Sequence, residues 1–395
     1  MNNRLVAPFA GAAISYLAWT GPEWAGIAAL LPLLWYIAPT RLFATLTVFS
    51  YYLVGSRSLP ESSVGFFGDD HSIIFGVGIW LAAAAINTAP WIVAWKDSPS
   101  TLQLALRLLL VVITISIPPV GWIGWLSPWL AASSVIPGLG WGSVLIGLIL
   151  LLSIPMLWNS GKRSVSLIVL PLLLSVQTLF LSGHPTAPSD WQEIETHWGK
   201  SPVQATASEF NRWKMIALEA ERQFNTGTRV VIFPEQIAGE SGKLAETFIG
   251  AYLNPHLNEG KTLLFGSTIA DGSLVTNAVS ILSDDEVKRY YARQTVPIAM
   301  WRPWNAVSYQ QSWYGPSTLN VAGKKVAFSA CFEDFLFGLA LISFIHEQPE
   351  IIVSVANAWW ANGADEIKVQ LLHVKLLASV FNAPLVRAIN QPLAK

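Results

Sequence analysis

The sequence is poor in cysteine, in charged residues and in metal- or phosphate-binding patterns, and each shortage excludes a class of protein. Cys331 is the only cysteine among 395 residues, which excludes an intramolecular disulfide framework. Only 12% of the residues are charged and the formal net charge is −1, so no global field recruits nucleic acid or an acidic partner. The six histidines have no metal-ligand spacing, and no glycine-rich phosphate loop is present. We therefore expect no metal, no cofactor and no direct nucleic-acid binding.

Hydrophobic residues are abundant, at 52% of the chain with 19 tryptophans. Long apolar runs with few charges between them fill the first half of the chain. A helix needs roughly 20 apolar residues to cross a bilayer, so the first three runs are short. So many apolar runs could not all be buried in a soluble domain of this size, and we expect a membrane domain over 1–182 with about seven transmembrane helices. The runs are 5–19, 24–38, 42–54, 73–95, 102–117, 141–157 and 165–181.

The first run also resembles a signal peptide, but the six runs after it favour an uncleaved span. Basic residues in loops mark the cytoplasmic side of a membrane protein. With the N-terminus inside, the inner loops hold Arg4, Arg41, Lys96, Lys162 and Arg163, and the outer loops hold Glu23, Arg57, Glu61, Asp69 and Asp70. An odd number of spans then places the rest of the chain outside. We expect a multi-pass protein of a bacterial inner membrane with its soluble domain in the periplasm.

The segment 118–141 has no charge and carries four tryptophans among proline and glycine. Because proline and glycine break helices and tryptophan favours the membrane interface, we expect a loop lying in that interface or re-entering it. Its role is either an aromatic belt or the wall of a lipid-facing entrance to the soluble domain.

Ordinary charge density returns after a linker, 183–192, that is rich in proline and serine. Apolar runs that read as strands then alternate with runs of helical periodicity, which predicts an α/β layered domain over 193–395. His373, on the apolar-patterned last helix, is expected to pack rather than to bind a metal. The predicted strands are 229–235, 262–268, 273–282, 324–330, 351–358 and 384–390, and the predicted helices are 209–224, 242–253, 335–345 and 366–381.

Three polar residues lie at or just past strand ends in this domain: Glu235, Cys331 and Asn357. Chemistry in α/β sheets collects at the carboxyl ends of strands. A thiol at a strand-to-helix turn meets unpaired N–H groups that lower its pKa and can hold an oxyanion, and a nearby carboxylate can take its proton. The alternative is that Cys331 is a small buried hydrophobic residue.

Four blocks in this half resemble the nitrilase, or carbon–nitrogen hydrolase, superfamily. They are IFPEQ (232–236), SACFEDF (329–335), VANAWWANG (355–363) and PLVRAINQ (384–391). With apolar spans ahead, the whole is similar to apolipoprotein N-acyltransferase. That resemblance implies an αββα layered domain with a Glu–Lys–Cys triad.

The resemblance also implies roles for particular residues. Glu235 would be the general base, Cys331 would carry the acyl group as a thioester, and Glu333 would be a further carboxylate of the site. Asn357, Trp359 and Trp360 are candidate substrate-binding residues. The two tryptophans either wall an acyl chain, rest on the bilayer surface or belong to the core. The implied acyl donor is a phospholipid, and the implied acceptor is a lipoprotein amine.

The lysine of the triad is missing. Counting back from Val296-Pro297 places Ala292 at its position. Arg293, one residue along, offers positive charge but cannot shuttle a proton at neutral pH. A one-residue shift also turns a strand side chain to the other face, so Arg293 would need a bulge to reach the site. Slow or absent catalysis follows from such a loss, because one oxyanion donor is worth ~10²–10³ in rate.

The chain ends soon after PLVRAINQ, where the acyltransferase continues. This feature, the seven apolar runs and the block ARQTVPIAMWRPW (292–304) are more similar to a related family of membrane proteins that act in conjugal plasmid transfer. Two functions therefore remain open. The chain either supports conjugation, with the conjugation machinery and the bilayer as partners and a degenerate site, or it is an active N-acyltransferase or amidase.

Overall fold

A computed structural model describes residues 6–68, 71–163, 185–201, 207–271, 274–284, 286–305, 308–361 and 365–393. The chain forms two compact units, which we call the helical unit and the sheet unit. The helical unit comprises Met1–Pro185, Phe335–Leu339 and Gly363–Asn382. The sheet unit comprises Thr186–Asp334, Ala340–Asn362 and Ala383–Lys395. The division is therefore not a single point in the sequence, because one late helix groups with the N-terminal half.

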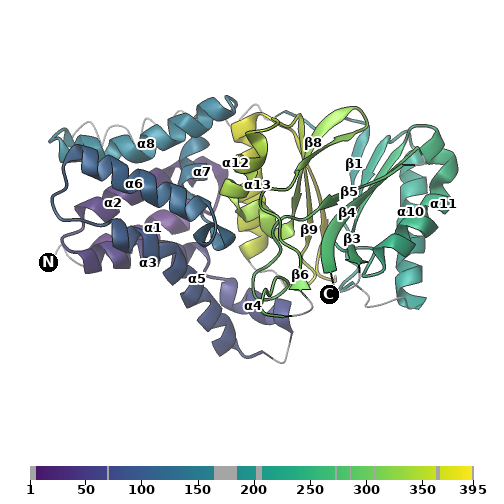
Figure 1. Cartoon of the computed structure of the whole chain (residues 1–395), viewed down its shortest axis with the longest axis horizontal. Helices are drawn as coiled ribbons and strands as arrows, with labels where there is room; N and C mark the ends of the chain where they lie inside the picture. Colours follow the sequence, from purple (N-terminus) through teal and green to yellow (C-terminus); the bar gives the residue numbers. More distant parts are fainter. Residues whose placement is uncertain are drawn as a thin grey trace. The chain divides into compact units, whose positions relative to one another are not determined.

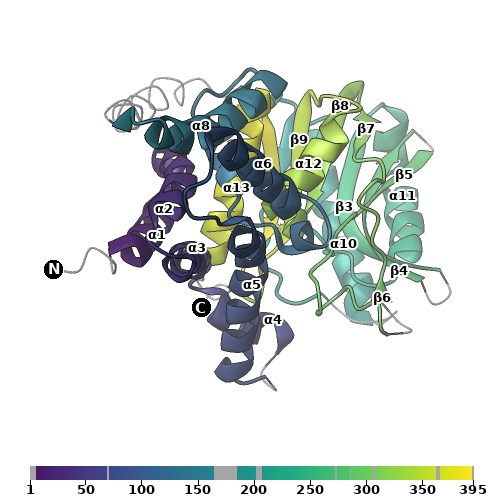
Figure 2. The ribbon, with the colours of Figure 1, turned by 60° about the vertical axis from the view of Figure 1, so that its left-hand side comes forward.

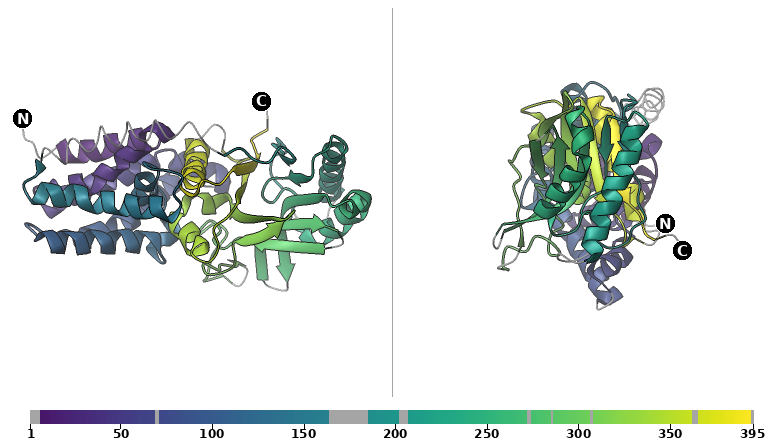
Figure 3. Two further views of the ribbon diagram at one scale, coloured as in Figure 1. Left: turned by 90° about the horizontal axis from the view of Figure 1, so that it is seen from above. Right: turned by 90° about the vertical axis from the view of Figure 1, so that its right-hand side faces the viewer.

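The helical unit consists of helices that run side by side (Figure 3). Helix starts follow the local sequence: Thr40 accepts a hydrogen bond from the backbone N–H of Phe43 at 3.4 Å, and Ser100 with Gln103 forms a capping box. The described elements are α1 (Val6–Ala18), η1 (Pro22–Leu30), α2 (Leu31–Ile37), α3 (Arg41–Gly55), α4 (Leu59–Phe67), α5 (Ile73–Ala94), α6 (Thr101–Ser116), η2 (Val120–Ile123), α7 (Pro128–Ser133), α8 (Trp141–Asn159) and α13 (Asp365–Phe381).

Six of the seven predicted apolar runs lie on these helices, and the seventh, 165–181, lies outside the described residues. Two described helices, α5 with 22 residues and α8 with 19, are long and apolar enough to cross a membrane by length and composition. The other apolar helices are shorter than the usual span. The count of about seven spans therefore stays a prediction.

The tryptophan-rich segment 118–141 differs from its prediction as a loop, because it contains η2 and α7. Helix α7 begins at Pro128, which is favoured in the first turn, after Ser127 accepts the Leu130 N–H at 3.3 Å. Helix α4 was not predicted either, and it also begins with a proline near its start. Both helices have fewer than ten residues, too few for a clear hydrophobic period.

Helix α13 is fixed in the helical unit by His373, which is fully buried as expected. Its Nε2 accepts the Leu126 N–H at 3.0 Å, its Nδ1 bonds to the Val369 carbonyl at 2.8 Å, and its ring stacks on Trp19. At the start of the helix, Asp365 pairs with Arg57 at 2.6 Å. These contacts explain why α13 groups with the N-terminal half of the chain.

The sheet unit holds two sheets (Figures 1 and 2). The first has the order β1-β2-β3-β4-β5, with β1 to β3 parallel and β3 to β5 antiparallel, and β6 pairs with β4. The second has the order β10-β9-β8-β7, parallel except for β7. The strands are β1 (Trp191–Glu193), β2 (Val230–Ile232), β3 (Thr262–Asp271), β4 (Leu274–Ser283), β5 (Glu286–Tyr291), β6 (Ser308–Tyr309), β7 (Thr318–Val321), β8 (Lys324–Ala330), β9 (Ile351–Asn357) and β10 (Leu385–Asn390).

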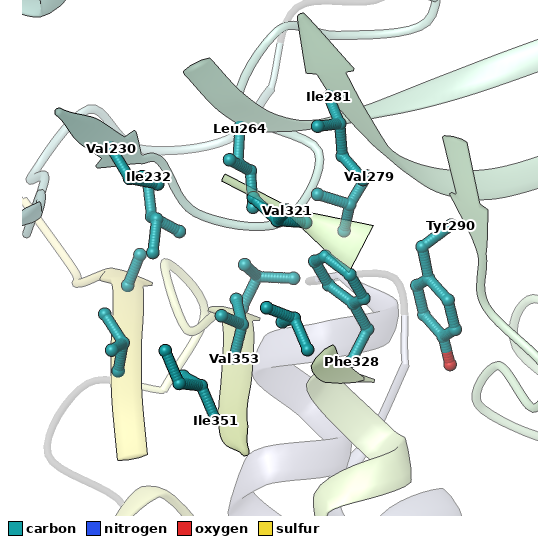
Figure 4. Close-up of a cluster of buried hydrophobic side chains, with 14 of the residues drawn as sticks. Val230, Ile232, Leu264, Val279, Ile281, Tyr290, Val321, Phe328, Ile351 and Val353 are labelled. Atoms are coloured by element: carbon teal, nitrogen blue, oxygen red, sulfur yellow. The ribbon is translucent and has the colours of Figure 1, made fainter. Parts of the chain in front are cut away.

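The main core lies between the two sheets, where Val279 and Tyr290 of the first face Phe328 and Val353 of the second (Figure 4). A second core lies between the first sheet and helices α10 (Ala207–Asn225) and α11 (Gly242–Asn258). Layered α/β packing is therefore confirmed for one helix layer and two sheets. Of the strands that the sequence analysis missed, β1, β5 and β7 are sheet edges, which are often short or charged and carry a weak signal.

Candidate active site of the sheet unit

Cys331 lies immediately after β8 and opens the short helix η3 (Cys331–Phe335). Its φ of 48° lies in the left-handed region, which non-glycine residues rarely adopt. The residue as a whole is partly exposed. It forms a hydrogen bond with the Glu235 carboxylate, and the backbone N–H of Asn357 donates to the sulfur. The structure thus brings together the three residues that the sequence placed at strand ends.

Glu235 lies on the turn that follows β2, and the residue is 5% exposed. Gly266 of β3 makes this turn possible, since a Cβ there would lie 2.5 Å from the Glu235 Cα. Asn277 of β4 donates its Nδ2–H to Glu235 Oε1 at 2.5 Å. Burial raises the pKa of Glu235 to about 7, against the hydrogen bonds from Cys331 and Asn277. A carboxylate with a pKa near neutrality is suited to act as a general base.

Burial also raises the pKa of the Cys331 thiol well above its usual range, and the negative charge of Glu235 raises it further. The Asn357 N–H acts in the opposite direction. Backbone N–H donation therefore has the expected effect on the pKa, but burial and the carboxylate outweigh it and the net pKa is raised. The thiol is hydrogen-bonded to the carboxyl group of Glu235, and a thiolate would form if its proton passed to that group.

The Glu333 carboxylate accepts hydrogen bonds from four groups, which lie on β8, on β5 and on the segment just after β5. Its Oε2 accepts the Tyr290 O–H at 2.6 Å and the Ala330 N–H at 2.9 Å. Its Oε1 accepts the backbone N–H groups of Arg293 at 2.5 Å and Gln294 at 3.0 Å. The carboxylate thus ties the Cys331 turn to the segment after β5.

Position 292, where the resemblance places the lysine, is a buried alanine in the core between the sheets. Its N–H bonds to the Asn277 carbonyl at 2.8 Å, so it adjoins the residue that holds Glu235. The buried guanidinium of Arg293 bonds to the Ser343 hydroxyl and to the Tyr290 hydroxyl. Burial raises the pKa of Glu333, and the charge of Arg293 opposes that rise. These hydrogen bonds hold the guanidinium beside Tyr290, which also donates to Glu333.

Asn357 and Asn390 end the neighbouring strands β9 and β10 in register. Asn390 donates an Nδ2–H to Asn357 Oδ1 at 2.9 Å. Trp360 Nε1–H donates to the Asn357 carbonyl at 2.9 Å, and the Trp359 ring lies under the ammonium of Lys200 at 5.4 Å from its centroid. The predicted substrate residues therefore surround the strand end that contacts Cys331.

A buried ion pair between Asp334 and Arg387 anchors the turn that Cys331 opens. Asp334 accepts the Arg387 Nη1–H at 2.7 Å and the Ser329 hydroxyl at 2.6 Å, and it also bonds to Ser354. The sequence analysis missed this cluster, together with Asn277, Tyr290 and Asn390. The available signal was a polar residue inside an apolar strand, which Asn277 and Arg387 both provide. Within the described residues, no cluster of His, Cys, Asp or Glu could hold a metal ion.

A two-sheet α/β unit with a Glu–Cys pair at its strand ends is what the resemblance to carbon–nitrogen hydrolases implies. No family model matches the chain. Along nearly its whole length the chain is similar to conjugal transfer proteins named TraB. It is 26% identical to the one from Agrobacterium fabrum over 404 residues, covering 96% of this chain and 90% of that protein. It is 27% identical over 389 residues to a probable conjugal transfer protein TraB of Sinorhizobium fredii, covering 93% and 94%.

Similar solved structures include an amidase from Nesterenkonia sp. with a TM-score of 0.37 and 12% identity, covering 51% of this chain and 74% of that chain. A carbon–nitrogen hydrolase from Helicobacter pylori G27 has a TM-score of 0.36 and 13% identity, covering 48% and 72%.

Proposed function

We propose that this chain is an integral membrane protein that supports conjugal plasmid transfer. The similarity to two proteins named for that process carries the proposal, because it extends over 96% and 93% of the chain and includes both units. The helical unit would lie in a bacterial inner membrane and the sheet unit in the periplasm. The bias of basic residues toward one set of loops supports this orientation.

Exposed apolar side chains support the membrane assignment of the helical unit. Leu106 and Leu110 of α6 are 57% and 59% exposed, and Leu145 and Ile149 of α8 are 58% and 52% exposed. Val93 of α5 is also exposed. A monomeric soluble protein seldom exposes so many large apolar residues, whereas contact with lipid would cover them.

Deletion and complementation test the conjugation proposal. Loss of the gene from a plasmid-bearing donor should lower the transfer frequency, and the wild-type gene should restore it. Cys331 reports the location of the sheet unit, because it is the only cysteine and is partly exposed. A membrane-impermeant maleimide should label it in spheroplasts. Label that appears only after lysis would contradict the periplasmic assignment.

A second candidate function is Cys-dependent acyl transfer, which the thiol–carboxylate hydrogen bond favours. Glu235 would take the Cys331 proton as the sulfur attacks an ester carbonyl of a phospholipid. The tetrahedral adduct would collapse to a thioester, and the leaving alkoxide would regain that proton from Glu235. An amine of a lipoprotein would then attack the thioester, release the thiol and form the amide. In this scheme Glu333 and Arg293 position the turn and do not touch the substrate.

Trapping separates the two candidates. With the acceptor amine withheld, an acyl adduct that hydroxylamine removes should accumulate on Cys331 and be absent from the Cys331→Ala variant. If no adduct forms on the wild-type protein and Cys331→Ala restores conjugation at normal abundance, the sheet unit serves as a scaffold. A large loss of transfer in Cys331→Ala would instead require chemistry at this site.

A further inference from the structure

A short segment after β1, residues 198–201, connects the two sides of the Glu235–Cys331 site. On one side Asn390, which holds Asn357, accepts the Trp198 N–H at 3.0 Å and donates to the Gly199 carbonyl at 2.8 Å. On the other side the Ser201 hydroxyl donates to the Gln236 carbonyl at 2.5 Å. Because Asn357 contacts the sulfur and Gln236 follows Glu235, Lys200 lies between two anchored points at the rim of the site.

The Lys200 side chain is exposed and its ammonium lies 5.4 Å from the centroid of the Trp359 ring. Trp359 follows β9 two residues after Asn357. The segment is further fixed by Arg212, whose Nη2–H donates to the Trp198 carbonyl at 2.8 Å. A cation–π contact at an exposed site is weak, so the ammonium can turn toward an anion. The Trp359 ring therefore contacts the Lys200 ammonium only weakly, and the ammonium remains free to move toward an anion.

The charges behind the rim make this cation significant. Three buried carboxyl groups, Glu235, Glu333 and Asp334, lie on or beside the Cys331 turn. Asp334 is paired with Arg387, and the charge of Arg293 acts on Glu333, whereas position 292 supplies no charge. The charges that act on Glu235 are those of Asp334 and Glu333, so an ionised Glu235 repels an anionic substrate unless a further cation offsets its charge. Lys200 brings such a cation from a part of the sequence remote from the lysine block of the resemblance.

We propose that Lys200 determines specificity at this site: it favours an acyl substrate with an anionic group, a phosphate or a carboxylate, near the carbonyl that Cys331 attacks. The proposal deepens the acyl-transfer function and rests on it, because an anionic molecule bound here is a substrate only if Cys331 takes its acyl group. The effect of the Lys200 charge on reagents that reach the Cys331 thiol can be tested without any turnover.

Two alkylating reagents of similar size provide that test, because iodoacetate is anionic and iodoacetamide is neutral. Cys331 is the only cysteine, so all labelling of the full chain in detergent reports this thiol. Lys200→Gln should lower the ratio of the iodoacetate rate to the iodoacetamide rate by about three- to tenfold at low salt. Lys200→Arg should restore the ratio. Lys214→Gln, which removes an exposed lysine from α10, should leave the ratio unchanged. An unchanged ratio in Lys200→Gln, or an equal fall in Lys214→Gln, would overturn the proposal.

Protection of Cys331 from iodoacetamide identifies the anion. If dihexanoyl phosphatidylglycerol protects the wild-type thiol but not Lys200→Gln, the anion is a lipid phosphate. If glutarate does so, the anion is a carboxylate. If neither protects, the specificity role is overturned. If the reagent ratio responds but no thioester can ever be trapped, the charge placement stands and the acyl-transfer function fails, so the two failures are distinguishable.

Discussion

Replacing Glu333 by glutamine tests whether this residue holds the Cys331 turn in place. The buried carboxylate accepts four hydrogen bonds, two on each oxygen. A glutamine retains one acceptor oxygen and places an amide N–H group where two donors converge. Each buried donor left without an acceptor costs roughly 1–3 kcal/mol, and the amide recovers part of this by avoiding the burial of a charge. We expect a net destabilisation of about 3 kcal/mol.

For a unit of this size such a loss lowers Tm by roughly 6–12 °C. The assay is thermal unfolding of the full chain in detergent, followed by tryptophan fluorescence. Glu286→Gln is the matched control, because Glu286 lies on β5 with its side chain 57% exposed in an ion pair with Lys288. Surface changes of this kind usually stay within about 0.5 kcal/mol. A Tm for Glu333→Gln within one or two degrees of the control would refute the reasoning.

Further predictions concern the buried charges of the sheet unit. The raised pKa of Glu235, about 7 against the ordinary 4.5, means that the folded protein binds more protons than the unfolded one between these values. The free energy of unfolding should therefore fall by about 3 kcal/mol as the pH rises from 4.5 to 7, and urea titrations of Glu235→Gln should lack most of this fall. Arg387→Met should destabilise the protein by about 3–5 kcal/mol by leaving Asp334 unpaired, and adding Asp334→Asn should recover at least half of the loss in the same titration. Asn277→Leu removes a donor that lowers the pKa of Glu235, so this carboxyl group stays neutral to higher pH and repels the thiolate less. The pH profile of Cys331 alkylation should therefore move to lower pH, and an unchanged profile would contradict the hydrogen bond.

The sequence predicts the central strands and helices of the sheet unit well, because buried parallel strands give continuous apolar runs. Strand β9, for example, is predicted as 351–358 and observed as Ile351–Asn357. The edge strand β5 was missed because its residues include Glu286, Lys288 and Arg289 and its burial is incomplete. The sequence did not predict the grouping of α13, since it depends on the contacts of His373 with Leu126 and of Asp365 with Arg57, which lie far away in the sequence.

The candidate site shows the same limit. The strand-end rule accounts for Cys331 and Asn357, which follow the adjacent strands β8 and β9. Glu235 follows β2 of the other sheet, so its meeting with Cys331 depends on the packing of the two sheets and was indicated only by the resemblance. The net rise in the Cys331 pKa was not predicted, because the burial that causes it depends on packing that no local pattern encodes. The hydrogen bond from the Arg293 N–H to Glu333 joins residues 40 positions apart in sequence, and no pattern in either segment predicts this contact.

The central claim is that Glu235 and Cys331 share a hydrogen bond in one site, and alkylation of Cys331 tests it most directly. Removing the Glu235 charge with Glu235→Gln should lower the pKa of the thiol and raise its thiolate fraction. The repulsion of two unit charges 4 Å apart is worth up to ~4 kcal/mol at an effective dielectric constant of 20, and roughly half of the gain is lost because a less basic thiolate is less nucleophilic. We therefore predict that iodoacetamide at pH 8 alkylates Glu235→Gln about tenfold faster than the wild-type protein. An unchanged rate in the variant would contradict the contact on which the account depends.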